Sequence, residues 1–191
     1  MLQDEAVRVD ERGTAVSASV LTDEIRALIG HVGPVVVAPL PYSDERHRRF
    51  MHALMEDQAM HLDAGAAASS KYGALVAPPL MPMHSLMRAL GDPDPLDALL
   101  TDPDWDGLGV ASSTAMPPIP TSLKRVLNGG TEAEFCQLLR IGDVVHAQAK
   151  SAAIEERLGT SGPMLLVKTE ITYKNQDGDV LAVVTMTVIR R

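Results

Sequence analysis

Apolar and polar positions follow a helical period in the first half of this chain and a strand-like pattern in its last third. Apolar residues at helical spacing predict helices at 21–30, 43–55 and 77–91, where Thr22, Ser43 and the Pro78–Pro79 pair provide suitable starts. Residues 33–41 are β-branched and bracketed by glycine and prolines, which favours a short strand. Residues 57–76 show no periodicity, so we predict an ordered loop there.

The last third of the chain is predicted to form an antiparallel meander. The strand-like runs are 131–139, 143–157, 162–175 and 179–191. The turn "NQDG" between the last two runs has hairpin chemistry, because Gly178 can adopt a positive φ. A long buried helix at 79–90, wrapped by a curved antiparallel sheet, is the economical α+β arrangement of these elements.

The domain organisation follows from the segments without such a pattern. Residues 1–20 are polar and rich in small side chains, which is typical of a loose arm. Residues 92–122 are rich in proline and acids, and we interpret them as a long excursion because nothing after them resembles an independent domain. We therefore predict a single domain over 21–191.

Composition excludes several classes of protein. At 191 residues and a net charge of −8, the chain fits one domain and lacks the basic surface that nucleic-acid binding requires. No apolar run approaches the ~20 residues of a membrane span, and the N-terminus lacks a secretory h-region. Cys136 is the only cysteine, so a reducing cytoplasm is expected, with this thiol buried.

The stretch "EDQAMHLD" at 56–63 concentrates acids, an amide and a histidine directly after a predicted helix. It could be a solvated helix end, with His61 as a surface residue. Alternatively, it could hold an acid/base pair formed by Glu56 and His61, because a carboxylate and an imidazole that share one water can move protons to and from a substrate. The local residues leave both interpretations open.

Several segments together resemble one protein family. The stretches "LTDEIRALIGHVGP", "KYGALVAPPL", "NGGTEAEF", "IGDVV" and "TEITYKNQDGDVLA" occur in the order seen in MaoC-like hot-dog dehydratases. The chain is most similar to the N-terminal-type module of that family, which also occurs in mycobacterial (3R)-hydroxyacyl dehydratase subunits. The resemblance covers residues 21–191 and implies a hot-dog fold.

The resemblance also implies an activity and a site. Active members hydrate trans-2-enoyl thioesters to (3R)-3-hydroxyacyl thioesters, or catalyse the reverse reaction, with a signature similar to G-D-x-N-P-x-H-x-D. On this chain the catalytic acid falls on Glu56 and the histidine on His61, while Gln58 takes the place of the substrate-binding asparagine and Ala59 that of the proline. Glutamate in place of aspartate displaces the carboxylate by about 1 Å, a shift that can cost roughly 10²-fold in rate.

Hydration also requires amide donors for the enolate oxygen. Pro78 and Pro79 cannot donate, so Leu80 or Met81 would supply the amide. The resemblance further places Gly129 and Gly130 near the acyl-thioester channel. Basic residues are candidates for coenzyme A phosphates, or serve solubility alone: Lys124, Arg125 and Lys150. The other histidines show no metal-ligand spacing, so no metal is expected, and no cofactor besides the acyl-CoA or acyl carrier protein thioester that serves as substrate.

Two main functions remain open at this point. The chain is either an enoyl-CoA hydratase/(3R)-hydroxyacyl dehydratase, or a subunit of one, that acts on a bulky or long acyl chain such as a fatty-acyl, polyketide or steroid side-chain thioester. Alternatively, it is a non-catalytic hot-dog subunit that shapes the acyl tunnel of a heteromeric hydratase. A thioesterase is a third option, for which no separate nucleophile stands out. We expect an obligate pair with a second MaoC-like subunit or with itself, burying at least ~2,000 Å².

Overall fold

The structure is a computed structural model that describes residues 8–9, 15–16, 19–86 and 114–191, together with positions 91, 97 and 101. The predicted arm over 1–20 contributes a short antiparallel pair, β1 (Arg8–Val9) and β2 (Ala15–Val16). Its other residues before 19, like most of the predicted excursion over 92–122, lie outside the described part of the chain.

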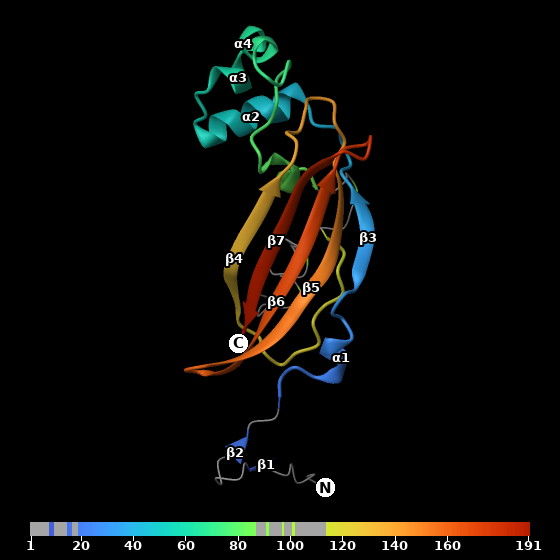
Figure 1. Ribbon diagram of the computed structural model, residues 1–191, viewed down its shortest axis with the longest axis vertical. Coiled ribbons are helices and arrows are strands. Elements are labelled where there is room, and N and C mark those ends of the chain that lie inside the picture. Colours follow the sequence, from blue (N-terminus) through green and yellow to red (C-terminus); the bar gives the residue numbers. More distant parts are fainter. Residues whose placement is uncertain are drawn as a thin grey trace.

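A twisted antiparallel sheet is the main body of the fold (Figure 1). Its strand order is β3–β5–β6–β7–β4. The strand bounds are β3 (Val32–Val37), β4 (Val126–Phe135), β5 (His146–Gly159), β6 (Gly162–Lys174) and β7 (Val180–Arg190). The predicted hairpin turn before β7 is confirmed, because Gly178 has a φ of 89° and Asn175 Oδ1 accepts from the amides of Asp177 and Asp179.

The first strand of the predicted meander differs from expectation. Strands β5, β6 and β7 form the meander, whereas β4 pairs with β7 at the far edge of the sheet. It begins at Val126 rather than at 131, because "NGG" lies within the strand, at a bulge between Asn128 and Gly130. Gly130 has a φ of 118°, a value that glycine tolerates. Cys136 directly follows this edge strand and is exposed, so its predicted burial is wrong.

Helices gather at one end of the sheet, drawn uppermost in Figure 1. They are α2 (Asp44–Leu54), α3 (Ala59–Leu62), α4 (Ala64–Ser69) and the 3₁₀ helix η1 (Met81–His84). Helix α2 and its Ser43 cap match the prediction, since the Ser43 side chain accepts from the amide of Arg46. The predicted loop over 57–76 is wrong: Asp63 caps α4 at 2.7 Å, and alanine has the highest helix propensity of any residue.

The predicted central helix at 79–90 is not continuous in the described residues. Only η1 forms, and residues 87–90 lie outside the described part. Prolines explain the difference, because Pro82 lacks the amide hydrogen that an α-helical ladder would use. Tight i→i+3 bonds form instead, from Met83 to Leu80 and from Ser85 to Pro82. Leu80, expected on a buried stripe, is 46% exposed.

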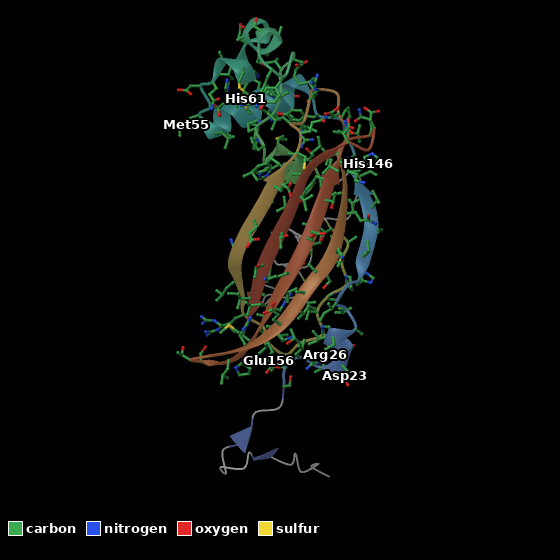
Figure 2. All side chains as sticks on the ribbon, viewed as in Figure 1. Asp23, Arg26, Met55, His61, His146 and Glu156 are labelled. Carbon is green, nitrogen blue, oxygen red and sulfur yellow. The ribbon has the colours of Figure 1, made fainter. Side chains whose placement is uncertain are left out.

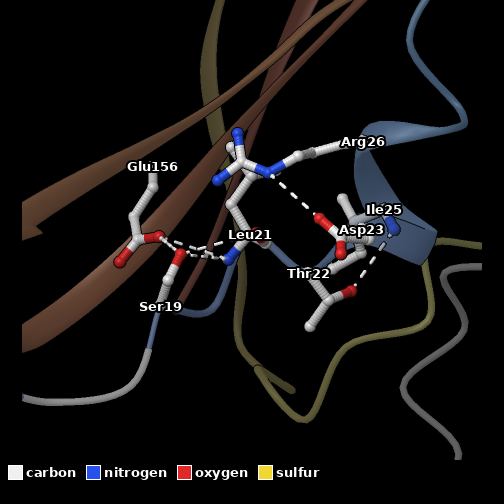
Figure 3. Close-up of polar contacts among 7 residues, drawn as sticks. All are labelled: Ser19, Leu21, Thr22, Asp23, Ile25, Arg26 and Glu156. Atoms are coloured by element: carbon white, nitrogen blue, oxygen red, sulfur yellow. Dashed lines mark hydrogen bonds and ion pairs between the residues drawn. The ribbon is translucent and has the colours of Figure 1, made fainter. Parts of the chain in front are cut away.

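The opposite end of the sheet carries α1 (Asp23–Arg26), which is shorter than the predicted helix at 21–30. Its Thr22 cap is confirmed, and the chain before it is fixed to β5 because the carboxylate of Glu156 accepts from the Ser19 hydroxyl and the Leu21 amide (Figure 3). These bonds lower the pKa of Glu156, and the bond from Ser19 has the largest effect.

The buried side chains form two clusters on the same sheet. The cluster near the helices contains Tyr42, Met81, Leu139, Val145, Ile171, Tyr173, Leu181 and Val184, with several alanines. The cluster near α1 contains Ile25, Ile154, Leu165 and Val167. The sheet therefore holds two hydrophobic cores, one toward each end.

Candidate functional site

The stretch at 56–63 forms a tight turn followed by a helical turn in the helix layer. Helix α2 ends at Met55, which adopts a left-handed φ of 53° and is 88% exposed. Glu56 then folds back, and its Oε1 accepts from the amides of Asp57 at 3.0 Å and Gln58 at 2.9 Å. Gln58 is exposed, and its backbone begins α3 without a side-chain cap. The backbone therefore places Glu56, Gln58 and His61 in consecutive turns, while the printed side-chain bonds of Glu56 and of His61 go to different partners.

The imidazole of His61 is buried within the helix layer (Figure 2), with 5% of the residue exposed. Its Nδ1 lies 2.6 Å from the carbonyl oxygen of Val76. A carbonyl only accepts, so Nδ1 must carry the proton, and in the neutral ring Nε2 is then the basic nitrogen. Among the described residues, nothing hydrogen bonds to Nε2. His61 is thus a buried imidazole with a fixed tautomer, and the surface position considered from the sequence is excluded.

A second histidine, His47, bonds to the backbone of His61. His47 Nε2 lies 2.5 Å from the carbonyl oxygen of His61, and His47 Nδ1 lies 3.0 Å from the Tyr42 hydroxyl. Facing a carbonyl, Nε2 of His47 must carry the proton, so Nδ1 of the neutral ring accepts from Tyr42. Burial raises the pKa of Tyr42 above its ordinary value, an effect that Arg46 partly offsets. The tyrosine therefore remains a donor.

Sequence reasoning missed this support. His47 was considered only as a metal ligand, and its contact with His61 joins positions too far apart for any local pattern to reveal. The one signal in the sequence was the four-residue spacing of His47 and Met51, which places both on one face of α2, and the structure buries both.

The predicted amide donors lie in η1. Met81 is buried, and its amide already donates to the carbonyl of Pro78 at 3.0 Å. The Leu80 amide has no partner among the described residues. His61 bonds to the carbonyl of Val76, which lies four residues before Leu80 in the segment that leads into η1. His61 and the Leu80 amide therefore lie at the same end of the molecule.

Other predicted residues lie elsewhere. Strand β4 runs toward the helices and ends there (Figure 1). Gly129 and Gly130 lie in its first half, so they are not close to His61 in the helix layer. Lys124 and Arg125 line a hollow together with Arg191, and Lys150 is exposed on β5. His84 is exposed, and its ring packs on Phe50 with centroids 5.3 Å apart.

A cavity of about 450 Å³ lies against the sheet between the two hydrophobic cores. One wall is the segment 114–119, which reaches β3 so closely that a Cβ at Gly33 would lie 3.0 Å from Met116 Sδ. The lining is mainly apolar: Leu28, Met116, Pro117, Pro118, Ile119, Val126, Val167 and Val188, with Thr114, Ser151, Thr169 and Arg190 as the polar members. A cavity of this size and polarity suits a hydrocarbon group.

Two further properties concern the described residues only. They contain no group of three or more His, Cys, Asp or Glu side chains able to hold a metal ion. None of their helices has the length and apolar character needed to cross a membrane.

The likeness to solved structures concerns the fold. The chain is similar to the ChsH1–ChsH2 complex from Mycobacterium tuberculosis, with a TM-score of 0.64, 18% identity, and coverage of 87% of this chain and 86% of that one. The C-terminally truncated HadBC (3R-hydroxyacyl-ACP dehydratase) complex of the same organism gives a TM-score of 0.53 and 18% identity, over 85% and 96%. A MaoC-like dehydratase from Rhodospirillum rubrum gives 0.53 and 22%, over 84% and 94%.

These likenesses confirm the predicted α+β hot-dog fold. No curated protein matches the chain. The family model described as "FAS1-like, dehydratase domain region" matches residues 28–184, which is most of the sequence. The predicted resemblance to the dehydratases is thereby confirmed. This chain belongs to the FAS1-like dehydratase domain region family.

Proposed function

We propose that this chain is a hydro-lyase, or a subunit of one, that hydrates trans-2-enoyl thioesters or dehydrates (3R)-3-hydroxyacyl thioesters. The observation that carries the proposal is the His61 imidazole, which is buried, is held at Nδ1 by the Val76 carbonyl and has no partner at Nε2 among the described residues. In a chain of a dehydratase family, a basic nitrogen fixed in this way fits the proton transfer that hydration requires.

In the proposed reaction His61 and Glu56 act on one water molecule. The water oxygen bonds to the β-carbon, Nε2 of His61 takes the water proton, and the α-carbon gains a proton from the pair, so one water is added overall. The Leu80 amide is the available donor for the enolate oxygen, since the Met81 amide is bound to Pro78. Backbone amides of its own turn hold the carboxylate of Glu56, whereas the Val76 carbonyl and His47 hold His61, so both side chains are fixed before substrate binds.

The substrate proposed is a bulky or long acyl thioester carried by coenzyme A or acyl carrier protein. The cavity of about 450 Å³ supports this choice, because its apolar lining fits a hydrocarbon group and its volume exceeds that of a short acyl chain. The chemistry uses only protein side chains and amides, so the proposal includes no further cofactor.

A second function is favoured by a different observation. The carboxylate of Glu56 is occupied by two backbone amides, and two of the four residues before Pro82 are prolines without an amide hydrogen. Both features fit a non-catalytic hot-dog subunit that shapes the acyl tunnel while a partner chain carries the chemistry. The ChsH1–ChsH2 and HadBC structures are both complexes, which supports a second hot-dog chain as the proposed partner.

The edge strands support the same assembly. Nine of the ten residues of β4 are exposed, including Leu127 and Phe135, and the opposite edge strand β3 exposes Val32, Val35 and Val37. Edge strands that expose apolar side chains are normally covered in stable proteins. Light scattering on the chain alone and with a co-expressed hot-dog partner tests this point, and a stable monomer at micromolar concentration contradicts it.

One variant separates the two functions. In the purified chain, or its complex, His61→Ala should lower the rate of 2-enoyl-CoA hydration by at least about 10²-fold. His84→Ala is the matched control, because it removes an imidazole that is exposed. Full activity of His61→Ala in the same assembly would assign the chemistry to the partner and leave this chain as the non-catalytic subunit.

A further inference from the structure

Among the described residues that line the cavity between the two cores, one is charged: Arg190, near the end of β7. The register of the sheet shows on which side its side chain leaves the strand. Val188, two residues earlier, lines the same cavity, and so does Val126, the cross-strand partner of Arg190 on β4. Residues two apart on a strand share one face of a sheet, as do direct cross-strand partners. The Arg190 side chain therefore starts on the cavity face.

The guanidinium of Arg190 is reachable and has no counter-ion in the described part of the chain. The residue is half-buried, and an arginine packs its stem on apolar surface while its charged end stays accessible. Among the described residues, none forms a hydrogen bond or ion pair with this guanidinium. Glu156 lies in the same cross-strand row, beyond Leu165, but its carboxylate already accepts from Ser19 and Leu21.

Further positive charge lies at the same end of the sheet. Lys124, Arg125 and Arg191 line a second hollow, and two backbone hydrogen bonds join Arg125 to Arg191. These residues directly precede β4 or follow β7, so they are neighbours of Arg190, although the net charge of the whole chain is −8. Positive charges clustered around an opening steer anions toward it.

We propose that this cavity binds a free aliphatic carboxylate of medium chain length, with the carboxylate on Arg190 and the hydrocarbon chain along the apolar wall. A guanidinium holds a carboxylate through two parallel hydrogen bonds, which are stronger where water is partly excluded. The chain would extend toward Thr169, which lines the cavity and pairs with Met186, four residues before Arg190. At about 3.3 Å per residue, this span is roughly 13 Å, which suits a chain of medium length.

This site goes beyond the proposed function, because its ligand is not a thioester and undergoes no reaction. Through Leu165, Arg190 shares a cross-strand row with Glu156, which lies at the end of the molecule opposite His61 (Figure 2). A carboxylate on Arg190 therefore cannot contact the His61 imidazole. Its hydrocarbon chain would occupy the same cavity as the proposed acyl group, so the two ligands would exclude each other.

Isothermal titration calorimetry on the full chain or its complex tests the site with decanoate, 1-decanol and acetate. Arg190→Gln should weaken decanoate binding by about 5- to 20-fold, because a charge-assisted pair in a partly shielded site is lost. Binding of 1-decanol, which has the same chain without the charge, should not change. Acetate should not bind at concentrations at which decanoate saturates the site, because it lacks the apolar chain.

Two further variants separate the local contact from general attraction. Arg191→Gln is the matched control, since it removes the same charge from the next residue, which lines the other hollow, and it should leave decanoate binding nearly unchanged. Arg190→Lys keeps the charge but loses the paired donors, so its loss should be smaller than that of Arg190→Gln.

Four results would overturn the proposal. Equal effects of Arg190→Gln and Arg191→Gln would show only a general attraction of anions. An equal loss of decanoate and 1-decanol affinity would show that Arg190 shapes the cavity without binding the carboxylate. Unfolding of Arg190→Gln would show that the fold itself needs the guanidinium, and absent binding of decanoate to the wild type would exclude the site. None of these results depends on hydration, because none of the probes is a thioester.

Discussion

Replacing His47 with alanine tests whether the buried pair behind His61 holds the candidate site in place. The variant removes the 3.0 Å bond to the Tyr42 hydroxyl and the 2.5 Å bond to the His61 carbonyl, and it leaves both groups unpaired. All three residues are at most 5% exposed, so each unpaired group should cost about 1–3 kcal/mol. The expected loss in the free energy of unfolding is therefore roughly 4 kcal/mol, or about 12 °C in Tm for a chain of this size.

Urea unfolding followed by circular dichroism measures this loss, and Tyr42→Phe separates its parts. In the wild type, Tyr42→Phe should cost about 1–2 kcal/mol, because it leaves Nδ1 of His47 without a donor. In the His47→Ala background the same change should instead be stabilising by about 1–3 kcal/mol, because it removes the buried hydroxyl that His47→Ala left unpaired. Equal costs in the two backgrounds would refute the reasoning, because they would show that Tyr42 and His47 do not interact.

Three further predictions concern the sheet and its titratable groups. Gly129→Ala should lower the free energy of unfolding by about 1–3 kcal/mol in urea, because the new Cβ would lie 2.8 Å from Thr187 Cγ2; no loss would show that β4 shifts freely. Glu156 has a lowered pKa in the folded chain, so its contribution to folding stability is present above the unfolded pKa near 4.3 and is lost as pH falls through the folded pKa. Glu156→Gln should therefore flatten the acid side of a profile of Tm against pH, and an unchanged profile would contradict this. Burial raises the pKa of Tyr173 to about 12, so stability should fall as pH rises from about 10 toward 12, and Tyr173→Phe should reduce that fall in alkaline unfolding monitored by tyrosinate absorbance.

The elements that the sequence predicts well are those whose signal is local. Strand β7 carries a long β-branched run, β6 has several β-branched residues, and the Asn175–Gly178 turn joins the two strands with its own side-chain bonds. Helix α2 has both a cap and an apolar face. In contrast, α4 is predicted wrongly because its alanines leave no apolar period, although Asp63 and the high propensity of alanine together were a readable signal.

The elements that fail depend on long-range packing or on proline. The position of β4 beside β7 is decided by the pairing of distant residues, which no local pattern encodes. The segment at 79–86 has the apolar spacing of a helix, but Pro82 and the i→i+3 bonds around it restrict the described part to η1. Apolar periodicity was therefore a weaker guide there than the missing amide hydrogens.

Prediction of the site divides in the same way. Glu56, Gln58 and His61 share one turn, so their grouping could be predicted from spacing along the chain. The burial of His61 could not, because it depends on the Val76 carbonyl and on His47, which approach from other segments.

The geometry of Glu56 fits both proposed functions. Its longer side chain lets the carboxylate turn back onto the amides of Asp57 and Gln58, which stabilises the turn after Met55. Only Oε1 takes part in those bonds, so the second oxygen can still accept from water. The same interaction that holds the turn therefore also orients the carboxylate, and its structural role does not exclude a role in catalysis. The imidazole is the more decisive group, because the Val76 carbonyl fixes its tautomer, His47 holds its backbone, and neither of these two contacts uses Nε2.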